Sequence, residues 1–372
     1  MKKFFKSLKS YPLIIFFAVL LYAVSIADWF SPQYKTSELE NRDLAVWPHF
    51  TLKSLINNEY TPKIEEFTED HFIQRNKWIS LKSISESILG KGENNGIVYG
   101  KDGYLFTKVI SADDTQRVKN ATAIAKFVQS NPDFNIKVMI APTCPSVMTD
   151  KVKPGSPVND AQAVIEQVKQ CVPGENITDV LGTLQAHSDE YIYYRTDHHW
   201  TTLGAYYAYA EYMNSIGRTP QSLDSFEFVE VENFLGTHYS KSKNFNVQPD
   251  VLSYIKNDSQ IDILGELGSI YDYEKLDVRD KYAMFLRGNN SISSIKGSGE
   301  GKILVIKDSY ANCFIPFMTN DFEQIDILDM RFYSQSVKKL METNMYDEVL
   351  ILYNTETFDT DIYLPKINLF NK

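Results

Sequence analysis

The hydrophobic pattern begins with a long uncharged run at the N-terminus. Residues 10–27 carry no charge and follow lysines at positions 2, 3, 6 and 9. A basic segment before an apolar run is typical of an export signal, and about 18 apolar residues can also span a bilayer. Trp29 and Phe30 come next, and aromatic residues often lie at the membrane interface. We expect residues 1–30 to be a cleaved signal or an uncleaved single-pass anchor, and we favour the anchor. The lysines would then be cytoplasmic, and the chain after Asp28 would lie outside.

The next segment, residues 31–92, is more polar. Prolines at positions 32, 48 and 62 interrupt any long helix, because proline lacks the backbone N–H that a helix interior needs. Between residues 60 and 90 the apolar and aromatic residues recur at helical spacing, including Ile64, Phe67, Trp78 and Leu81. The pattern predicts a linker followed by one or two amphipathic helices.

From residue 93 to residue 372 the pattern changes to apolar strands that alternate with helices. Gly100-Lys-Asp-Gly103, between β-rich residues, predicts a hairpin. Continuous apolar strands buried on both faces are typical of a parallel sheet that helices cover on both sides. Strands are expected at 134–142, 302–306, 324–330 and 347–354, and helices at 113–129, 158–170, 179–186, 201–216 and 334–343.

Residues 220–300 break this alternation. They contain short strand-like pieces, and SISSIKGSGEGK, residues 291–302, has the composition of a flexible loop. We interpret the segment around 220–300 as an irregular insertion in an otherwise regular α/β domain.

Composition and charge narrow the class of protein. The 372 residues are 43% hydrophobic and 13% aromatic, which predicts a substantial core, and the net charge of −10 argues against a broad nucleic-acid-binding surface. Three cysteines, Cys144, Cys171 and Cys313, are too few for a disulfide scaffold. A bridge between Cys144 and Cys171 is compatible with the sequence, which does not decide whether it forms.

The first candidate for chemistry is Ser309. It follows the apolar strand 302–306 and the turn Lys307-Asp308, and we expect it to open a helix. Ligand crevices in parallel α/β sheets lie at the carboxyl ends of the strands. A serine there is displayed in the crevice, at the positive end of a helix dipole. Because serine also commonly caps helices, its position alone does not establish a nucleophile.

Asp197-His198-His199-Trp200 supplies the partners that a serine nucleophile needs. An imidazole takes the hydroxyl proton, and a carboxylate fixes the tautomer of that imidazole. In an extended stretch residues two apart point the same way, so Asp197 and His199 should share a face. His198 should point elsewhere, as a structural or substrate-side residue. Packing of two histidines in a turn is the alternative to a catalytic dyad.

A metal site fits this pattern less well. Metal catalysis needs at least three ligands, and adjacent histidines diverge in an extended chain. The other four histidines, at positions 49, 71, 187 and 238, show no ligand spacing. The chain also has no phosphate-cradling glycine motif. We therefore expect neither a metal nor another cofactor.

TDHHWTTLGAY resembles the signature of the DHHW family, which is similar to the SGNH-hydrolase-like proteins that O-acetylate alginate and other exopolysaccharides. The resemblance covers most of residues 38–360, and DHHW with the later serine is its most specific part. Further matching stretches are Glu40-Asn-Arg42, Asp70-His-Phe72 with Arg75, Asn95-Gly96, Gly100-Lys-Asp-Gly-Tyr-Leu105, Gly236-Thr237 with Tyr239-Ser-Lys241, and Leu328-Asp-Met-Arg331.

The resemblance implies a three-layer α/β/α, flavodoxin-like fold whose motif order is permuted, because here the Asp/His pair precedes the serine. By this analogy Asp197 orients His199, His199 is the base and Ser309 is the nucleophile. Asn354 and the Tyr310 N–H would donate to the oxyanion, although the chain has Lys-Asp-Ser where the family of hydrolases has Gly-Asp-Ser. The remaining candidates are Arg331, which would bind sugar or brace the site unless it forms only a solvent salt bridge, and His198.

The activity implied is transfer of an acetyl group, through acetyl-Ser309, to hydroxyls of an extracytoplasmic polysaccharide. Donor acetyl must then cross the membrane, so the resemblance implies a membrane-bound O-acyltransferase as partner. Two alternatives stay open. A carbohydrate acetylesterase would use the same chemistry with water as acceptor, and a non-catalytic surface protein would share only the fold.

Overall fold

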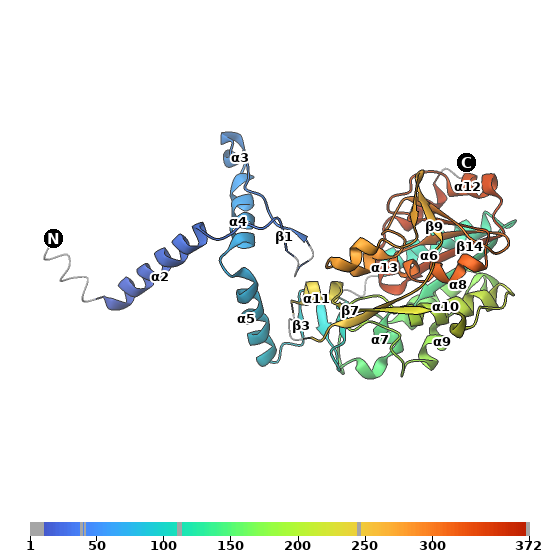
Figure 1. Ribbon diagram of the computed structural model, residues 1–372, viewed down its shortest axis with the longest axis horizontal. Helices are drawn as coiled ribbons and strands as arrows, with labels where there is room; N and C mark the ends of the chain where they lie inside the picture. The colour runs from blue at the N-terminus through green and yellow to red at the C-terminus, as the bar shows by residue number, and fades with distance from the viewer. Residues whose placement is uncertain (1–10, 38–39, 41, 110–113, 244–246, 370–372) are drawn as a thin grey trace. The chain divides into compact units, whose positions relative to one another are not determined.

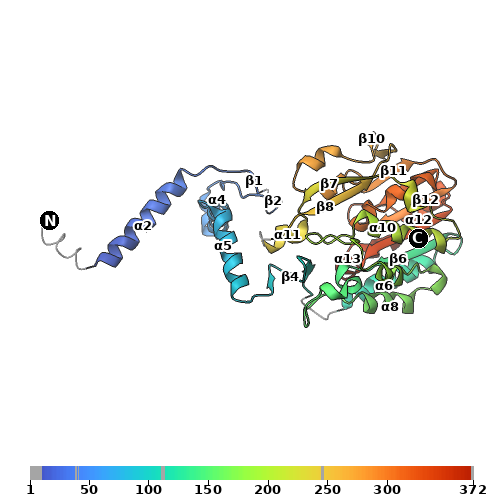
Figure 2. The ribbon, with the colours of Figure 1, turned by 60° about the horizontal axis from the view of Figure 1, so that its bottom comes forward.

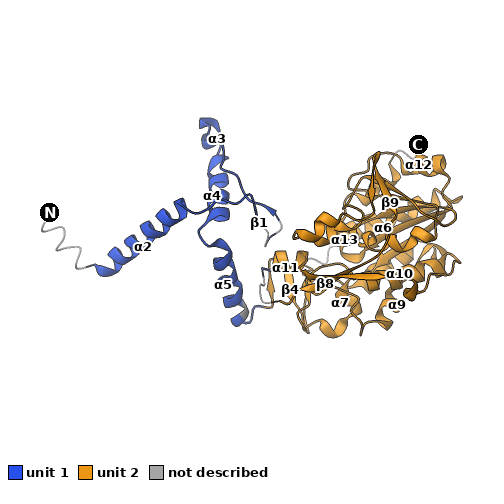
Figure 3. Ribbon diagram, viewed as in Figure 1, with its two compact units in different colours: residues 1–91, 243–245 blue, residues 92–242, 246–372 orange. Residues whose placement is uncertain are grey.

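The computed structural model describes residues 11–37, 40, 42–109, 114–243 and 247–369. The chain forms two compact units, residues 1–91 with 243–245 and residues 92–242 with 246–372 (Figures 1 and 3). The division at residue 92 lies next to the boundary expected between residues 92 and 93. The lysines at positions 2, 3, 6 and 9, expected in the cytoplasm, lie outside the described residues.

The first unit is helical. Its helix α2, an 18-residue run with no buried residue, is the one helix in the described part of the chain long and apolar enough to cross a membrane, by length and composition. Two further helices, α4 and α5, fulfil the prediction of amphipathic helices between residues 60 and 90. The elements are α2 (Pro12–Trp29), β1 (Thr36–Ser37), β2 (Arg42–Asp43), α3 (Leu52–Ile56), α4 (Tyr60–His71) and α5 (Arg75–Ile88) (Figure 1).

A charge cluster ties these elements together. Arg42 donates to both carboxylate oxygens of Asp70 on α4, at 2.9 Å from Nη1 to Oδ2, and Arg75 on α5 donates to Glu40 at 2.9 Å. Lys243 also pairs with Glu40. The Arg42 guanidinium lowers the pKa of Asp70 to about 2. Two of the stretches quoted for the family resemblance, Glu40-Asn-Arg42 and Asp70-His-Phe72 with Arg75, therefore meet in one ion-pair network.

The second unit is built on a seven-stranded mixed sheet. Four neighbouring strands, β13, β12, β14 and β6, are parallel, and β11, β9 and β10 continue the sheet antiparallel at the β13 side. The expectation of a purely parallel sheet was wrong for this half. The strands are β6 (Asn135–Ala141), β9 (Gln260–Ile263), β10 (Glu266–Ser269), β11 (Ile292–Lys296), β12 (Lys302–Lys307), β13 (Gln324–Leu328) and β14 (Glu348–Asn354).

The antiparallel strands come from the segment around 220–300, which is therefore not an irregular insertion. Its residues 292–296, expected in a flexible loop, form β11 between β13 and β9. Ser293 and Ile295 on β11 are buried while their neighbours are less so, the alternation of a half-buried strand. The segment also contributes β7 (Phe228–Phe234) and β8 (Asp250–Ile255), which pair antiparallel and lie side by side in Figure 2.

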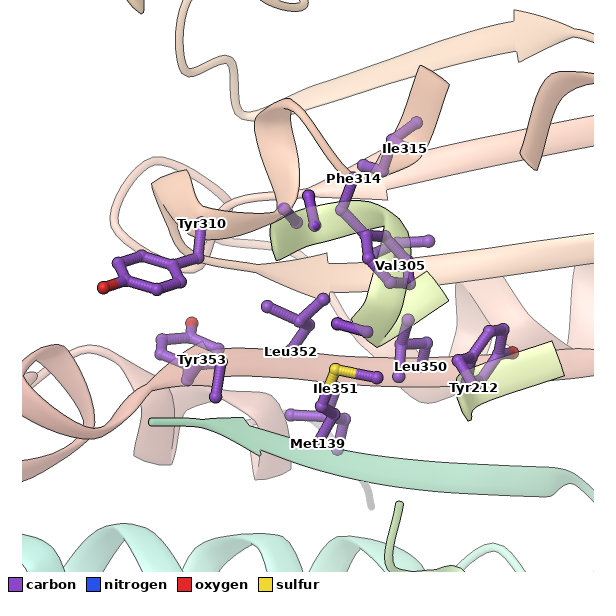
Figure 4. Packing of buried hydrophobic residues seen from close by; sticks show 14 of the residues in the cluster. Met139, Tyr212, Val305, Tyr310, Phe314, Ile315, Leu350, Ile351, Leu352 and Tyr353 are labelled. Carbon is purple, nitrogen blue, oxygen red and sulfur yellow. The ribbon is translucent and has the colours of Figure 1, made fainter. Parts of the chain in front are cut away.

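The core lies around the parallel strands. All seven residues of β14 are buried, as its continuous apolar sequence predicts. Figure 4 shows side chains of β12, β14 and β6 packed with Tyr310 and Phe314 from the chain after β12. The hairpin predicted at residues 100–103 is confirmed, since β4 and β5 pair antiparallel across it. The three cysteines are free.

The helices predicted at 113–129, 158–170, 179–186, 201–216 and 334–343 are confirmed with small shifts of their ends, and residue 113 lies outside the described residues. The helices pack in two groups. In one group α6 contacts α8 and α13, and in the other α10 contacts α9. The flavodoxin-like layering stays a prediction. The remaining strands are β3 (Glu93–Asn94), β4 (Ile97–Tyr99) and β5 (Leu105–Thr107), and the helices are α6 (Thr115–Gln129), α7 (Cys144–Val147), α8 (Ala161–Cys171), α9 (Leu181–Ala186), α10 (Thr202–Ser215), α11 (Thr237–Ser242), α12 (Val337–Asn344) and α13 (Thr355–Thr360).

Candidate active site

Ser309 lies directly after the buried strand β12, at the carboxyl end of the parallel sheet. Asp308 caps the turn with its carboxylate, and Ser309–Asn312 forms a single 3₁₀ turn, followed by a second one at Ile315–Asn320. The expected helix after Ser309 is therefore two short 3₁₀ segments. A long α-helix dipole is absent from this described segment, because a macrodipole needs several aligned α-helical turns. Ser309 is partly exposed, whereas its neighbours Asp308 and Tyr310 are buried.

The Asp-His segment is a tight loop rather than an extended stretch. Tyr193 and Trp200 form an isolated bridge, and the residues between Tyr194 and Trp200 are bends. After the loop the Thr201 hydroxyl caps α10 by accepting from the Gly204 N–H at 3.3 Å. A Cβ on Gly204 would collide with the Ile192 carbonyl and lie 3.2 Å from the Trp200 Cβ. Thr201 and Gly204 of the TTLG sequence thus fold the loop back onto its helix.

The loop brings Asp197, His199 and Ser309 into one hydrogen-bonded row. His199 Nε2 lies 2.8 Å from Ser309 Oγ, although the two residues are 110 positions apart in sequence. On the other side of the ring, His199 Nδ1 lies 2.5 Å from Asp197 Oδ1. Asp197 and His199 are both buried. The geometry can pass a proton from the serine hydroxyl to the imidazole while the carboxylate orients the ring.

The Asp197 carboxylate is fixed by residues at the start of α11. Thr237 donates to Asp197 Oδ2 from its backbone N–H at 2.7 Å and from its hydroxyl at 3.1 Å. Gly236 approaches so closely that an added Cβ would lie 2.6 Å from the Asp197 Cγ and nearer still to its Cβ. Burial alone would raise the pKa of Asp197, but the adjacent imidazoles and the Thr237 N–H hold that pKa well below its usual value.

His198 does not point away from this row, as an extended chain would require. Its ring lies against the His199 ring with centroids 3.8 Å apart, and its Nδ1 lies 2.7 Å from the Thr237 hydroxyl and 3.5 Å from Asp197 Oδ1. The bends of the loop put both histidines on the same carboxylate. Burial, and then the neighbouring His199, lower the pKa of His198 well below its usual value, so its ring is neutral at pH 7.

Tyr282, in the 3₁₀ segment Lys281–Met284, contacts both His199 and Ser309. Its ring stacks on the His199 ring with centroids 3.7 Å apart and an interplanar angle of 12°. Its hydroxyl donates to the Ser309 carbonyl at 3.1 Å. One residue of the 220–300 segment therefore fixes the plane of the imidazole relative to the serine turn.

Two further hydrogen bonds join the serine turn to the Asp-His loop. The Trp200 indole N–H donates to the Tyr310 carbonyl at 3.0 Å, and the Tyr310 hydroxyl donates to the His198 carbonyl at 2.5 Å. All three residues that make these bonds adjoin Ser309 or His199 in sequence. Because the bonds run in opposite directions, they fix the position of His199 relative to Ser309.

Asp250, at the start of β8, anchors the beginning of the loop. Its buried carboxylate accepts from the Tyr191 hydroxyl at 2.6 Å and from the Arg195 N–H at 3.0 Å. It also accepts from the Thr196 N–H at 2.8 Å and from the Thr196 hydroxyl at 2.6 Å. Asp250 thus accepts four hydrogen bonds, and two of them satisfy backbone N–H groups of a loop that has no regular secondary structure.

The two expected oxyanion donors both face Asp308. The Tyr310 N–H donates to Asp308 Oδ1 at 2.9 Å, and the Asn354 side-chain amide donates to Asp308 Oδ2 at 2.6 Å and to the Thr357 hydroxyl at 2.7 Å. Asn354 also caps α13 by accepting from the Thr357 N–H. This differs from the sequence expectation, because the buried carboxylate before Ser309 takes both donors. Burial raises the pKa of Asp308.

Lys307 and Arg331 lie near the same edge of the sheet. The Lys307 ammonium, which stands where a hydrolase of this resemblance has glycine, is buried and donates to Asn289 at 2.6 Å and Asn312 at 2.7 Å. Burial lowers the pKa of Lys307 to about 8. Arg331 is paired with the buried Asp329, donating to Oδ1 at 2.9 Å from Nε. Since its partner is buried, the pair is more than a solvent salt bridge, and it favours a bracing role.

The metal alternative can be examined in the same geometry. In the described residues, ligand atoms of Asp197, His198 and His199 lie within 4.8 Å of one another. However, both ring nitrogens of His199 and the Nδ1 of His198 are already hydrogen-bonded to Asp197, Ser309 and Thr237. An ion bound by all three side chains would displace at least one of these bonds. The arrangement therefore fits a proton relay better than a metal centre.

Three residues of the site were missed at the sequence level, namely Tyr282, Asp250 and the role of Thr237. All three come from the segment between residues 220 and 300, and they reach the Asp-His loop only through the fold. The pair Gly236-Thr237, quoted for the family resemblance, was the one available signal. Nothing in the local pattern around Tyr282 or Asp250 distinguishes them from other polar or aromatic positions.

The model of the DHHW protein family matches residues 91–328, well over half of the chain, and the chain belongs to that family, as the signature predicted. A search of curated proteins found no similar sequence.

Solved structures similar to this chain include the following three. A DHHW family protein from Eubacterium siraeum DSM 15702 is 23% identical, with a TM-score of 0.61 over 74% of this chain and 96% of that chain. Bacillus cereus PatB1 is 19% identical, with a TM-score of 0.59 over 72% and 98%. The O-acetyltransferase domain of Pseudomonas putida AlgJ is 15% identical, with a TM-score of 0.47 over 72% and 93%. The first two likenesses show a shared mixed α/β fold.

Proposed function

We propose that this protein is an O-acetyltransferase that moves an acetyl group, through acetyl-Ser309, to hydroxyls of an extracytoplasmic polysaccharide. The observation that carries the proposal is the continuous row of hydrogen bonds from Ser309 Oγ through His199 to Asp197. The similarity of the DHHW signature to proteins that O-acetylate exopolysaccharides supports the acetyl group and the acceptor class. The flavodoxin-like layering with permuted motif order belongs to the same proposal.

The first half of the reaction forms the acyl-enzyme. Ser309 Oγ attacks the acetyl carbonyl carbon as its proton passes to His199 Nε2, and the imidazolium is stabilised by Asp197. The tetrahedral intermediate collapses when His199 returns the proton to the leaving group, which leaves acetyl-Ser309. The leaving group departs with the electron pair of the broken bond and with the proton from His199.

The second half reverses these roles. A sugar hydroxyl gives its proton to His199 Nε2 and its oxygen attacks the acetyl-Ser309 carbonyl. Collapse of this intermediate returns the proton to Ser309 Oγ and releases the O-acetylated sugar. An esterase would differ only in using water, so acetyl transfer and hydrolysis share every residue named.

Stabilisation of the oxyanion requires N–H donors that are now bonded to Asp308. Tyr310 and Asn354 keep their proposed role as donors only if an acyl group draws their N–H groups away from Asp308. Arg331 is proposed to brace this edge through Asp329, and His198 to contact the substrate. No metal and no cofactor enter the proposed steps.

The proposed location follows from α2. Its length and apolar composition support a single-pass membrane anchor, with the second unit outside the cytoplasm. Acetyl groups would then have to reach Ser309 from across the membrane. We therefore include a membrane-bound O-acyltransferase as the donor partner, as the family resemblance implies.

Intact-mass analysis of Ser309→Ala tests the proposal. Wild-type protein should gain an acetyl group on Ser309 from 4-nitrophenyl acetate and a sulfonyl group from phenylmethanesulfonyl fluoride, while Ser309→Ala should gain neither. PatB1 has been solved with a sulfonyl adduct, which makes the second reagent a suitable probe. Ser130→Ala, at an exposed helix end, is the control and should be labelled as wild type. Full turnover of the ester by Ser309→Ala would refute the nucleophile.

The acceptor decides between the alternatives. Added oligosaccharide should divert labelled acetyl from free acetate to the glycan if the protein is a transferase, and should leave the acetate yield unchanged if it is an esterase. The non-catalytic alternative expects Ser309 out of reach of His199, which the 2.8 Å contact does not favour.

A further inference from the structure

The side chain of His198 has hydrogen-bonding capacity that the acyl-transfer steps do not use. Its Nδ1 faces Thr237 and Asp197, and 29% of the side chain is exposed. Within the described residues no hydrogen bond is made by its Nε2. The protonation of the two ring nitrogens therefore decides what His198 can offer to a substrate.

The surrounding hydrogen bonds assign the proton to Nδ1. The Thr237 hydroxyl has one proton, which it donates to the Asp197 carboxylate at 3.1 Å, so it must accept from His198 Nδ1 at 2.7 Å. Asp197 Oδ1 also lies 3.5 Å from the same nitrogen, where an N–H is attracted and a lone pair would be repelled. In the neutral ring Nε2 then carries a lone pair and can only accept a hydrogen bond.

The packing of the two tilted imidazole rings limits the direction of that lone pair. Both Nδ1 atoms lie on Asp197 Oδ1, at 2.5 Å for His199 and 3.5 Å for His198. The ring centroids lie 3.8 Å apart at an interplanar angle of 38°, and each Nε2 lies across its ring from the Nδ1 that is turned toward Asp197. His199 Nε2 meets Ser309. His198 Nε2 is therefore an acceptor on the ring next to the one that meets the reacting hydroxyl.

We propose that His198 Nε2 accepts a hydrogen bond from the hydroxyl adjacent to the attacking one, so that the site selects acceptors with two neighbouring hydroxyl groups. This inference rests on the proposed function and names its acceptor class. The attacking hydroxyl gives its single proton to His199 and has none for His198. A second hydroxyl on the next carbon of a sugar ring supplies that proton, and each of the two neighbouring imidazoles accepts from one hydroxyl of the pair.

Small alcohols test the acceptor class. With 4-nitrophenyl acetate as donor, trans-1,2-cyclohexanediol and cyclohexanol are compared as acceptors, and ester product is measured against free acetate. Wild-type protein should favour the diol about tenfold, equivalent to about 1.4 kcal/mol, the scale of one well-placed hydrogen bond. His198→Asn keeps a donor near the Nδ1 position but removes Nε2, and should lose most of the preference. His198→Gln places an amide near the Nε2 position and should restore part of it.

The controls separate this inference from the proposed function. His187→Asn makes the same exchange at a histidine that packs on Tyr207, away from Ser309, and should leave the preference unchanged. The burst of 4-nitrophenol and the acetyl mass on Ser309 report the nucleophile independently of any alcohol. Three results would overturn the inference while the burst and the acetyl mass still support Ser309 as the nucleophile. His198→Asn could keep the diol preference, wild-type protein could show no diol preference, or wild-type protein could transfer acetyl to neither alcohol.

A spectroscopic measurement covers the case in which the variants do not fold. The ¹⁵N shifts of the His198 ring in wild-type protein should show Nδ1 protonated and Nε2 unprotonated at neutral pH. The opposite tautomer would overturn the inference without reference to activity.

Discussion

Replacement of Gly236 by alanine should disable the site through Asp197 alone. The added Cβ would lie 2.6 Å from the Asp197 Cγ, whereas unbonded carbon atoms sit at about 3.5 to 4.0 Å. The carboxylate or the backbone at residue 236 must therefore move by about 1 Å. Both bonds from Thr237 to Asp197 originate next to this position, so they move with it.

The expected effect is larger on catalysis than on folding. A displacement of about 1 Å in a catalytic group can reduce the rate about 100-fold. Overpacking of a buried position costs about 1 to 3 kcal/mol in the free energy of unfolding. We expect kcat/KM for 4-nitrophenyl acetate to fall about 100-fold in Gly236→Ala, with a decrease in Tm of only a few degrees.

Gly182 provides the matched control. It lies in α9 with no atom near the position of an added Cβ, so Gly182→Ala should change the free energy of unfolding by no more than about 1 kcal/mol and leave turnover intact. Kinetics and thermal unfolding followed by circular dichroism are measured on both variants. A folded Gly236→Ala protein with turnover close to that of wild type would refute the conclusion that close packing at Gly236 positions Asp197.

Two further predictions concern residues around this site. Tyr282→Phe removes the hydrogen bond to the Ser309 carbonyl but keeps the ring on His199, and it should lower kcat several-fold. Tyr282→Leu removes both contacts and should lower kcat further. Equal kinetics of the two variants would show that the stacking contributes nothing to catalysis. Burial raises the pKa of Glu356 from 4.5 to about 7, so the folded state binds this proton more tightly and the free energy of unfolding should decline as pH rises from 4.5 through 7. Denaturant titrations across this range should show a flatter decline for Glu356→Gln, and an unchanged slope would contradict the assignment.

The parallel half of the sheet was predictable because its strands are continuous apolar runs. Residues 303–306 and 348–354 are buried, as expected of short continuous apolar runs in central strands covered on both faces. Strand β11 was missed for the opposite reason. Its serines and the glycines that follow have loop composition, and only pairing with β13 and β9 gives the segment its structure.

Some positions in the candidate site could likewise be predicted from the sequence, and others could not. The pairing of Asp197 with His199, and of His199 with Ser309, was anticipated from the chemistry that a serine hydroxyl needs, and the distances agree with it. The position of His198 was not anticipated, because residues 195–199 form bends where an extended chain was expected. The environment of Tyr310 and Asn354 also depended on the side-chain direction of Asp308, which no sequence pattern encodes.

The place of β12 within the sheet has a consequence for biosynthesis. This strand is flanked by β13 and β14, and both are translated after it. The imidazole loop is made 110 residues before the serine, yet the serine turn has no fixed position until the last strand, ending at Asn354, has joined the sheet. A nascent chain that stops before β14 would thus carry every element of the Asp-His loop and still be chemically inert, and reactivity would appear only after Asn354 has been translated.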